Sequence, residues 1–181
     1  MYRFDSQKGT LTPNDPPSAA LDPGSGPRHL AFTPDGNFAY VLAEMGSTIT
    51  AFAFDSSKGV LRKLQTLSTL PKGFKGQNDA AEIAVSPSGK FVYASNHGND
   101  SIAAFAIGAN GSLTLVERTP TQGKTPRGFA IDPSGSYLLV GNQASDNLVV
   151  CRMDPATGRL NPTGHVLDAP TSVAIQFVRA Q

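Results

Sequence analysis

The sequence predicts an all-β protein built as a β-propeller of four-stranded antiparallel blades. A hairpin pattern occurs three times, as RHLAFTPDGNFAYVLAE, AEIAVSPSGKFVYASNH and RGFAIDPSGSYLLVGNQ. The turn prolines Pro34, Pro87 and Pro133 are 53 and 46 residues apart. A strand-only repeat of this length is typical of propeller blades. No segment has a sustained 3.6-residue apolar period with caps, so no substantial helix is expected.

The hairpin turn has a physical reason for each of its residues. Pro34 fixes φ at the first turn position, Asp35 takes the second, and Gly36 supplies the positive φ that closes a three-residue hairpin with a bulge. The flanking runs are rich in Val, Ile, Phe, Tyr and Ala with partial alternation, as expected for strands buried between stacked blades.

The repeat continues beyond the hairpins. A third strand and another turn follow each one, in TITAFAFDSSKGVL, SIAAFAIGANGSL and NLVVCRMDPATGRL, and the opening MYRFDSQKGTL fits the same template. The segment PTSVAIQFV, residues 170–178, matches the first strand of a blade, with Val173 at the place of Leu30, Ile83 and Phe129. We therefore predict a single partial propeller domain over residues 1–181, consisting of a half blade, three full blades and one closing strand.

Composition narrows the classes of function. The net charge is +1 and no basic run occurs, so no nucleic-acid partner is expected. No apolar stretch reaches membrane-spanning length and Met1 starts no signal-peptide pattern, so we expect a cytoplasmic protein without a membrane partner. Cys151 is the lone cysteine, and its alignment with Phe52 and Phe105 predicts a buried strand residue rather than a nucleophile.

Several stretches together resemble the lactonase family of seven-bladed β-propellers. They are GPRHLAFTPDGNFAYVLAE, LPKGFKGQNDAAEIAVSPSGKFVYASN, NDSIAAFAI and TPRGFAIDPSGSYLLVGNQ, which cover nearly the whole chain in the family's order. The resemblance implies about half of a seven-bladed ring, corresponding to the C-terminal half of the family. It also implies an enzyme of the 6-phosphogluconolactonase type, which opens a sugar-phosphate lactone in the pentose phosphate pathway. Two alternatives stay open: a carboxy-muconate lactonizing enzyme, and a non-catalytic propeller fragment that serves as an interaction scaffold.

Two arginines occupy one position of the repeat. Arg28 and Arg127 each follow a proline, whereas the equivalent positions hold Ala81 and Thr171. The first residues of the inner strands lie at one mouth of a propeller, where two guanidinium groups would suit a substrate phosphate or carboxylate. The alternative is an ion pair between blades.

Three polar residues occupy another equivalent position of the blade repeat, near the end of the second strand. Glu44, His97 and Gln143 each lie 10 residues after the turn proline, which suggests a polar channel lining, although ordinary polarity at strand ends is the alternative. The resemblance implies functional residues at Arg28, His29 and Glu44, and it places an arginine where this chain has His97. We therefore predict that Arg28, His29 and Glu44 act in catalysis.

Substrate binding is assigned to Arg127, His97 and Gln143. His29 follows Arg28, so in a regular strand the two side chains point to opposite faces. His29 is equally consistent with a base, an orienting group or a structural residue. Either Glu44 or His29 would assist water, and the arginines would hold phosphate or stabilise an oxyanion.

The remaining expectations concern metals and assembly. The three histidines are scattered, so we expect neither a required metal nor a cofactor. The predicted opening and closing strands would leave sheet edges unpaired, and such edges pair with other chains. We therefore expect the chain to self-associate through these edges, either as a head-to-tail dimer that forms a ring or by aggregation.

Overall fold

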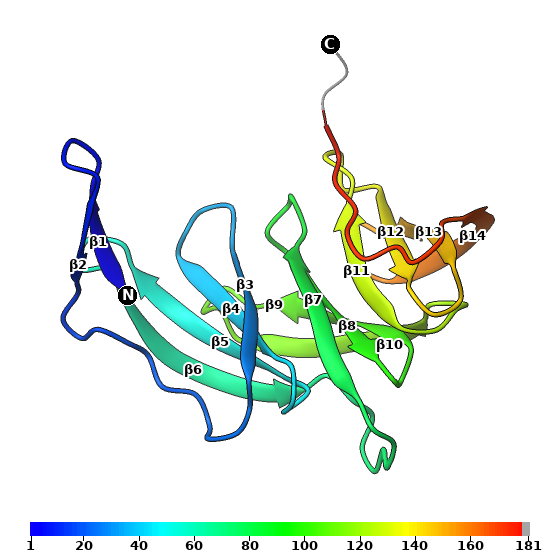
Figure 1. The fold of residues 1–181 in the computed structure, drawn as a ribbon, viewed down its shortest axis with the longest axis horizontal. Coiled ribbons are helices and arrows are strands. Elements are labelled where there is room, and N and C mark those ends of the chain that lie inside the picture. The colour runs from blue at the N-terminus through cyan, green and yellow to red at the C-terminus, as the bar shows by residue number, and fades with distance from the viewer. Residues whose placement is uncertain (179–181) are drawn as a thin grey trace.

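The computed structural model describes residues 1–178, and within them every element is a β-strand. One sheet has two strands and three sheets have four strands each, all antiparallel (Figure 1). The strands are β1 Tyr2–Asp5, β2 Thr10–Pro13, β3 Pro27–Phe32, β4 Phe38–Ala43, β5 Thr48–Asp55, β6 Val60–Ser68, β7 Asp79–Val85, β8 Phe91–His97, β9 Ser101–Ile107, β10 Leu113–Pro120, β11 Pro126–Ile131, β12 Tyr137–Asn142, β13 Asn147–Met153 and β14 Leu160–Asp168. The predicted all-β class is confirmed.

The three large sheets are meanders in which each strand pairs with the next one along the chain. Their orders are β3-β4-β5-β6, β7-β8-β9-β10 and β11-β12-β13-β14, which we call the first, second and third blades. The first strands β3, β7 and β11 lie side by side in the middle of the molecule (Figure 1). These three strands form the inner wall of the arc, as the first strands of propeller blades do.

The blades stack face to face through two apolar cores. Tyr40, Leu42 and Ile49 of the first blade pack with Val92, Ala94 and Phe105 of the second, and Tyr93, Ile102 and Ala104 of the second pack with Leu138, Val140 and Val149 of the third. Both faces of the second blade are therefore buried, which explains why its strands carry apolar runs rather than strict alternation.

The hairpin turns have the predicted geometry. Gly36, Gly89 and Gly135 have φ of 73°, 70° and 73°. The Gly36 amide donates to the Thr33 carbonyl at 2.9 Å, and the other two turns contain the same bond. These turns also sit against one another, since a side chain at Gly89 would contact Pro34. The inner strands therefore all enter their turns at one end of the stack, and they all begin at the other.

A tyrosine hydrogen bond also recurs at the two blade boundaries. The Tyr40 hydroxyl donates to the Gly111 carbonyl at 3.2 Å, and the equivalent Tyr93 hydroxyl donates to the Gly158 carbonyl at 2.9 Å. Both tyrosines are fully buried, so each bond satisfies a hydroxyl that burial would otherwise leave without a partner. The boundaries thus have a repeated polar contact within an apolar core.

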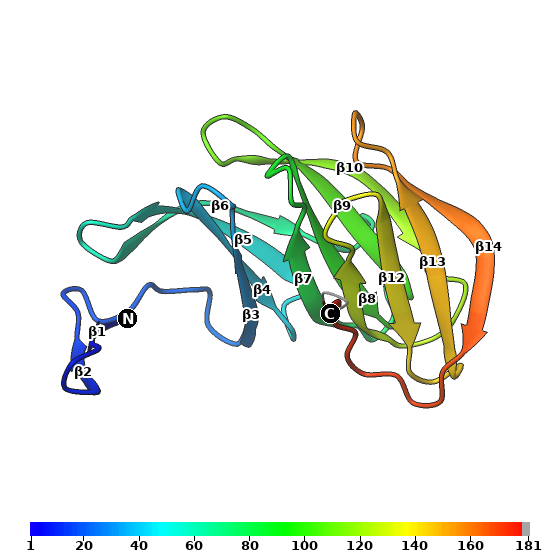
Figure 2. The ribbon, with the colours of Figure 1, turned by 90° about the horizontal axis from the view of Figure 1, so that it is seen from above.

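The opening hairpin stands apart from the three blades. In Figure 2, β1 and β2 lie at the end of a long connection rather than on a sheet face. Asn14, just after β2, is buried and donates to the carbonyl oxygens of Lys58 and Gly59 in the first blade. The connection then covers part of the free face of the first blade, where Ala19 and Leu21 pack against its buried residues.

The predicted closing strand differs in the structure. Residues 172–178 are extended chain without strand pairing. They nevertheless lie where the next inner strand would lie, because a side chain at Gly128 of β11 would strike the Val173 carbonyl (Figure 1). A first strand forms its ladder with a second strand, and no such strand lies beside this segment in residues 1–178. Within the same residues, no helix is long and apolar enough to cross a membrane.

Candidate functional site

Both arginines at the repeated post-proline position lie in β-bulges. In the first blade Pro27 is opposite Ala43 and His29 is opposite Leu42, so Arg28 is an extra residue in β3. The third blade has the same irregularity at Arg127, between Pro126 and Gly128. A bulge changes the direction of side chains and is common next to active sites. The strict alternation expected for Arg28 and His29 therefore does not hold.

Arg28 forms an ion pair with Glu44. Its Nη1 donates to Glu44 Oε1 at 2.7 Å, across the start of β3 and the turn that follows β4. The pair lies within one blade, so the alternative of an ion pair between blades is wrong for Arg28. The Arg28 side chain is only 19% exposed, and its Nε is buried without a hydrogen-bond partner in the described residues. The guanidinium thus keeps unused donor capacity at the start of β3.

His29 contacts the neighbouring blade. Its Nδ1 lies 2.9 Å from Oε1 of Glu82 in β7, and the two side chains are 41% and 29% exposed. An ionised carboxylate only accepts hydrogen bonds, so the imidazole form that fits a carboxylate at Glu82 has its proton on Nδ1. Sequence reasoning missed Glu82. Alignment of the repeats could have found it, because Glu82 in the second blade is equivalent to His29 in the first and Gly128 in the third.

His97 and Gln143 lie at strand ends, as expected, but neither contacts the Arg28–Glu44 pair or the His29–Glu82 pair. His97 is the last residue of β8, opposite Asp79, and Gln143 directly follows β12. Glu44 directly follows β4, and its carbonyl accepts a hydrogen bond from the Ala80 amide at the start of β7. No side-chain hydrogen bond or ion pair joins these groups in residues 1–178.

The backbone just before Arg127 has a strained conformation that a side chain of another loop holds in place. Thr125, two residues before it, has φ of 63°, and its amide donates to Asp100 Oδ1 at 2.9 Å. Asp100 itself has φ of 51°. Non-glycine residues with positive φ persist only where neighbouring contacts hold them. Arg127 makes no ion pair within residues 1–178, so its charge is available at the start of β11.

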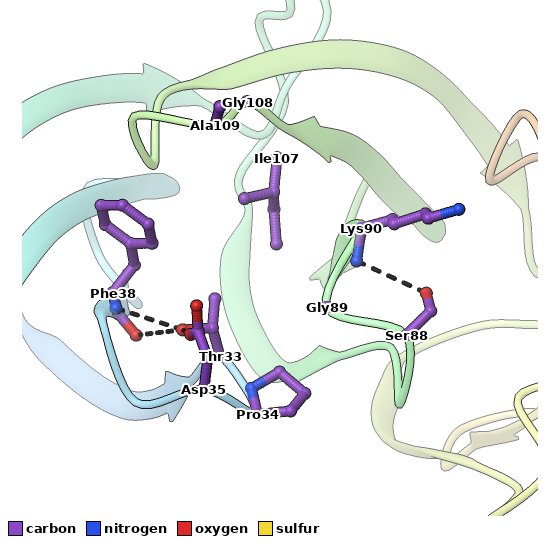
Figure 3. A pocket seen from close by; sticks show the side chains of 10 residues that line it. All are labelled: Thr33, Pro34, Asp35, Phe38, Ser88, Gly89, Lys90, Ile107, Gly108 and Ala109. Carbon is purple, nitrogen blue, oxygen red and sulfur yellow. Dashed lines mark hydrogen bonds between the residues drawn. The ribbon is translucent and has the colours of Figure 1, made fainter.

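One hollow lies at the opposite end of the inner strands from these residues. It has a volume of about 300 Å³ and lies between the turns of the first and second blades, where Asp35 and Lys90 are its only charged lining residues (Figure 3). A smaller hollow of about 90 Å³ lies between the equivalent turns of the second and third blades. This recurrence indicates a crevice that arises from turn-on-turn packing, and neither hollow includes a predicted site residue.

Metal binding and thiol chemistry find little support among the side chains described. In residues 1–178, no three His, Cys, Asp or Glu side chains come together in a metal-binding cluster. Cys151 is buried, and burial raises the pKa of its thiol to about 11. The thiol is therefore protonated at neutral pH, as its alignment with core phenylalanines suggests.

Comparison with known proteins decides the family. A family model described as "Lactonase, 7-bladed beta-propeller" matches residues 1–177. The chain belongs to this lactonase family. It is 36% identical to a 6-phosphogluconolactonase of Bacillus subtilis over 179 residues, which are 98% of this chain and 51% of that relative. It is 42% identical to a 6-phosphogluconolactonase of Formosa agariphila, over 87% of this chain and 44% of that relative.

A solved structure agrees with this assignment. The periplasmic gluconolactonase of Pseudomonas aeruginosa superimposes with a TM-score of 0.88 at 38% identity, over 94% of this chain and 48% of that one. The chain thus spans about half the length of the relatives it matches. The three blades and the hairpin described above correspond to about half of a seven-bladed ring.

Proposed function

We propose that this chain takes part in lactone hydrolysis of the 6-phosphogluconolactonase type, opening a sugar-phosphate lactone to the acid in the pentose phosphate pathway. The observation that carries the proposal is the pair of adjacent residues Arg28 and His29 on one bulge of an inner strand. One is a partly buried cation with unused donors, and the other is an imidazole with one free nitrogen. The 6-phosphogluconolactonases among the relatives supply the substrate class.

The reaction requires a base for water and a donor for the developing oxyanion. Water attacks the lactone carbonyl carbon and its proton passes to Nε2 of His29, while the Arg28 guanidinium stabilises the negative carbonyl oxygen. The intermediate then collapses, the bond between the carbonyl carbon and the ring oxygen breaks, and the imidazolium returns a proton to that oxygen. The product is the hydroxy acid.

The choice of His29 over Glu44 as the base follows from their partners. Glu44 Oε1 already accepts from Arg28 at 2.7 Å, so its role is to hold the guanidinium. His29 Nε2 has no hydrogen-bond partner in residues 1–178, and the ring is 41% exposed. An imidazole with one bonded and one free nitrogen is suited to accept a proton from water.

The third inner strand, β11, supplies a residue for substrate binding. Arg127 is free of ion pairs in the described chain and is the second residue of β11, so it is assigned to the phosphate, which guanidinium binds through two parallel hydrogen bonds. His97 and Gln143 are assigned to substrate hydroxyl groups, because both follow or end second strands at the same end of the stack.

The test measures acid release from 6-phosphogluconolactone by the purified chain, corrected for spontaneous hydrolysis. We expect catalysis that His29→Gln abolishes and that His165→Gln, on the outer strand β14, leaves unchanged. Equal activity of wild type and His29→Gln would refute the assignment of the base. Turnover of a carboxy-muconate instead of the phospholactone would favour a lactonizing enzyme, and no turnover of either would favour a scaffold.

Self-association is proposed as a second property. Large apolar side chains are exposed on the first and third blades, at Leu30 and Phe32 on β3 and at Val166 and Leu167 on β14. Burial of such side chains against another copy is favourable. Light scattering at micromolar concentration tests this property, and a stable monomer would contradict it.

A cytoplasmic location also stays a prediction. The structural relative from Pseudomonas aeruginosa is described as periplasmic, so the periplasm is the competing outcome. Cell fractionation in the source organism separates the two.

A further inference from the structure

The contact between His29 and Glu82 crosses a blade boundary, and no other member of that repeat position makes one. His29, Glu82 and Gly128 are equivalent residues of the three inner strands. At the next boundary the partners would be Glu82 and Gly128, and glycine has no side chain to offer. A contact that held the blades together should recur at both boundaries, as the Tyr40 and Tyr93 hydrogen bonds do.

Glu82 is fixed by three interactions of its own. Its Oε1 accepts from the Ile83 amide at 3.0 Å as well as from His29, and its backbone amide donates to Ser95 Oγ at 3.0 Å. The strand register explains the last bond. Ala80 is opposite Asn96 and Ile83 is opposite Ala94, so Ala81 and Glu82 together face Ser95 in a bulge. The serine hydroxyl replaces the ladder bond that the bulge removes.

The consequence is a carboxylate held still against one nitrogen of an exposed ring. Because the Glu82 carboxylate accepts a hydrogen bond from Nδ1–H, the proton is kept on Nδ1, and the lone pair of a neutral ring is on Nε2. The same contact limits rotation of the ring. A base whose lone pair has a fixed position needs less reorganisation when water binds.

We propose that Glu82 is the positioning residue for His29, acting across the blade boundary to fix the tautomer and the orientation of the imidazole. The inference rests on the proposed function insofar as it assigns His29 as the base. Glu82 itself contacts no reacting atom in this scheme. Its contribution is made through His29, in the way that a buried carboxylate orients the histidine of a hydrolase triad.

The tautomer can be read without any activity. Nitrogen-15 NMR of the imidazole rings distinguishes the two tautomers, and the chain has only three histidines to assign. At pH 8 we expect His29 to be the Nδ1–H tautomer in the wild type, and Glu82→Ala to shift the population toward Nε2–H. His165, which is exposed on β14, serves as the internal control and should not change.

Three variants separate positioning from simple loss of structure. Glu117→Gln is the matched control, because Glu117 Oε1 also accepts a backbone amide, that of Leu160, but lies in the outer strand β10. For catalysis, Glu82→Gln and Glu82→Ala should each lower kcat by at least about 10-fold with little change in KM. Glu117→Gln should leave kcat unchanged, even where it lowers the melting temperature.

The outcomes divide cleanly. An Nε2–H tautomer or a doubly protonated ring for His29 at pH 8 would overturn the inference, and so would wild-type kcat in both Glu82 variants. If the wild-type chain has no lactonase activity, the proposed function fails. The NMR result then decides alone whether Glu82 positions His29, so the two failures are distinguishable.

Discussion

Breaking the Arg28–Glu44 ion pair should destabilise the fold unequally, depending on which partner is removed. Exposed ion pairs contribute about 0.2–1 kcal/mol, whereas removing one partner from a fully buried pair costs about 3–5 kcal/mol. This pair is intermediate, with Arg28 19% exposed and Glu44 37% exposed. Glu44→Gln leaves the more buried charge, whose Nε already lacks a partner, so we expect a loss of about 2 kcal/mol. Arg28→Met leaves a carboxylate that water can reach, so about 1 kcal/mol is expected.

A double-mutant cycle in urea measures both numbers and their coupling. With an m-value of about 2 kcal/mol/M, Glu44→Gln should lower the unfolding midpoint by about 1 M. The double variant should be less destabilised than the sum of the two single variants by about 1 kcal/mol, as is usual for directly bonded side chains. If Arg28→Met is the costlier change, or if the coupling is below about 0.3 kcal/mol, the Arg28–Glu44 ion pair is not what stabilises this part of the first blade.

Three further outcomes are expected. Arg127→Met should change the free energy of unfolding by less than about 0.5 kcal/mol, since Arg127 makes no ion pair in the described chain. The same change should weaken the binding of an anionic substrate by about 1.5–3 kcal/mol, which kinetics at varied substrate concentration would measure. Tyr93→Phe removes the hydrogen bond to Gly158 and should lower the melting temperature by about 3–6 °C, whereas Tyr137→Phe, at an exposed residue, should not. Hydrogen bonds from the amides of the turn after β13 lower the pKa of Asp154 below 3.8, so the folded state binds fewer protons than the unfolded state in acid. Stability should therefore fall as the pH drops below about 3.8, and Asp154→Asn should reduce that dependence in pH-resolved urea titrations.

The sequence was sufficient for the blades because their signals are local. Strand propensity and the Pro-x-Gly turns act within a few residues, and their recurrence at Pro34, Pro87 and Pro133 marks each blade. The structure confirms the all-β class and the three four-stranded sheets. The closing segment 170–178 was a harder case. Its sequence fits an inner strand, but strand structure also requires a hydrogen-bonded neighbour, and the described chain offers none there.

The sequence by itself determined which residue types stand at the repeated positions: Arg28 and Arg127 after proline, and Glu44 after a second strand. Only the tertiary structure decided how they are paired. The Arg28 bulge breaks the alternation on which face assignments depend, and the partner of His29 is Glu82, 53 residues away on another blade. Side-chain pairing across a blade boundary depends on how two sheets stack and on one-residue shifts of register. Neither leaves a periodic pattern in the chain, because each is set by packing between segments that are distant in sequence.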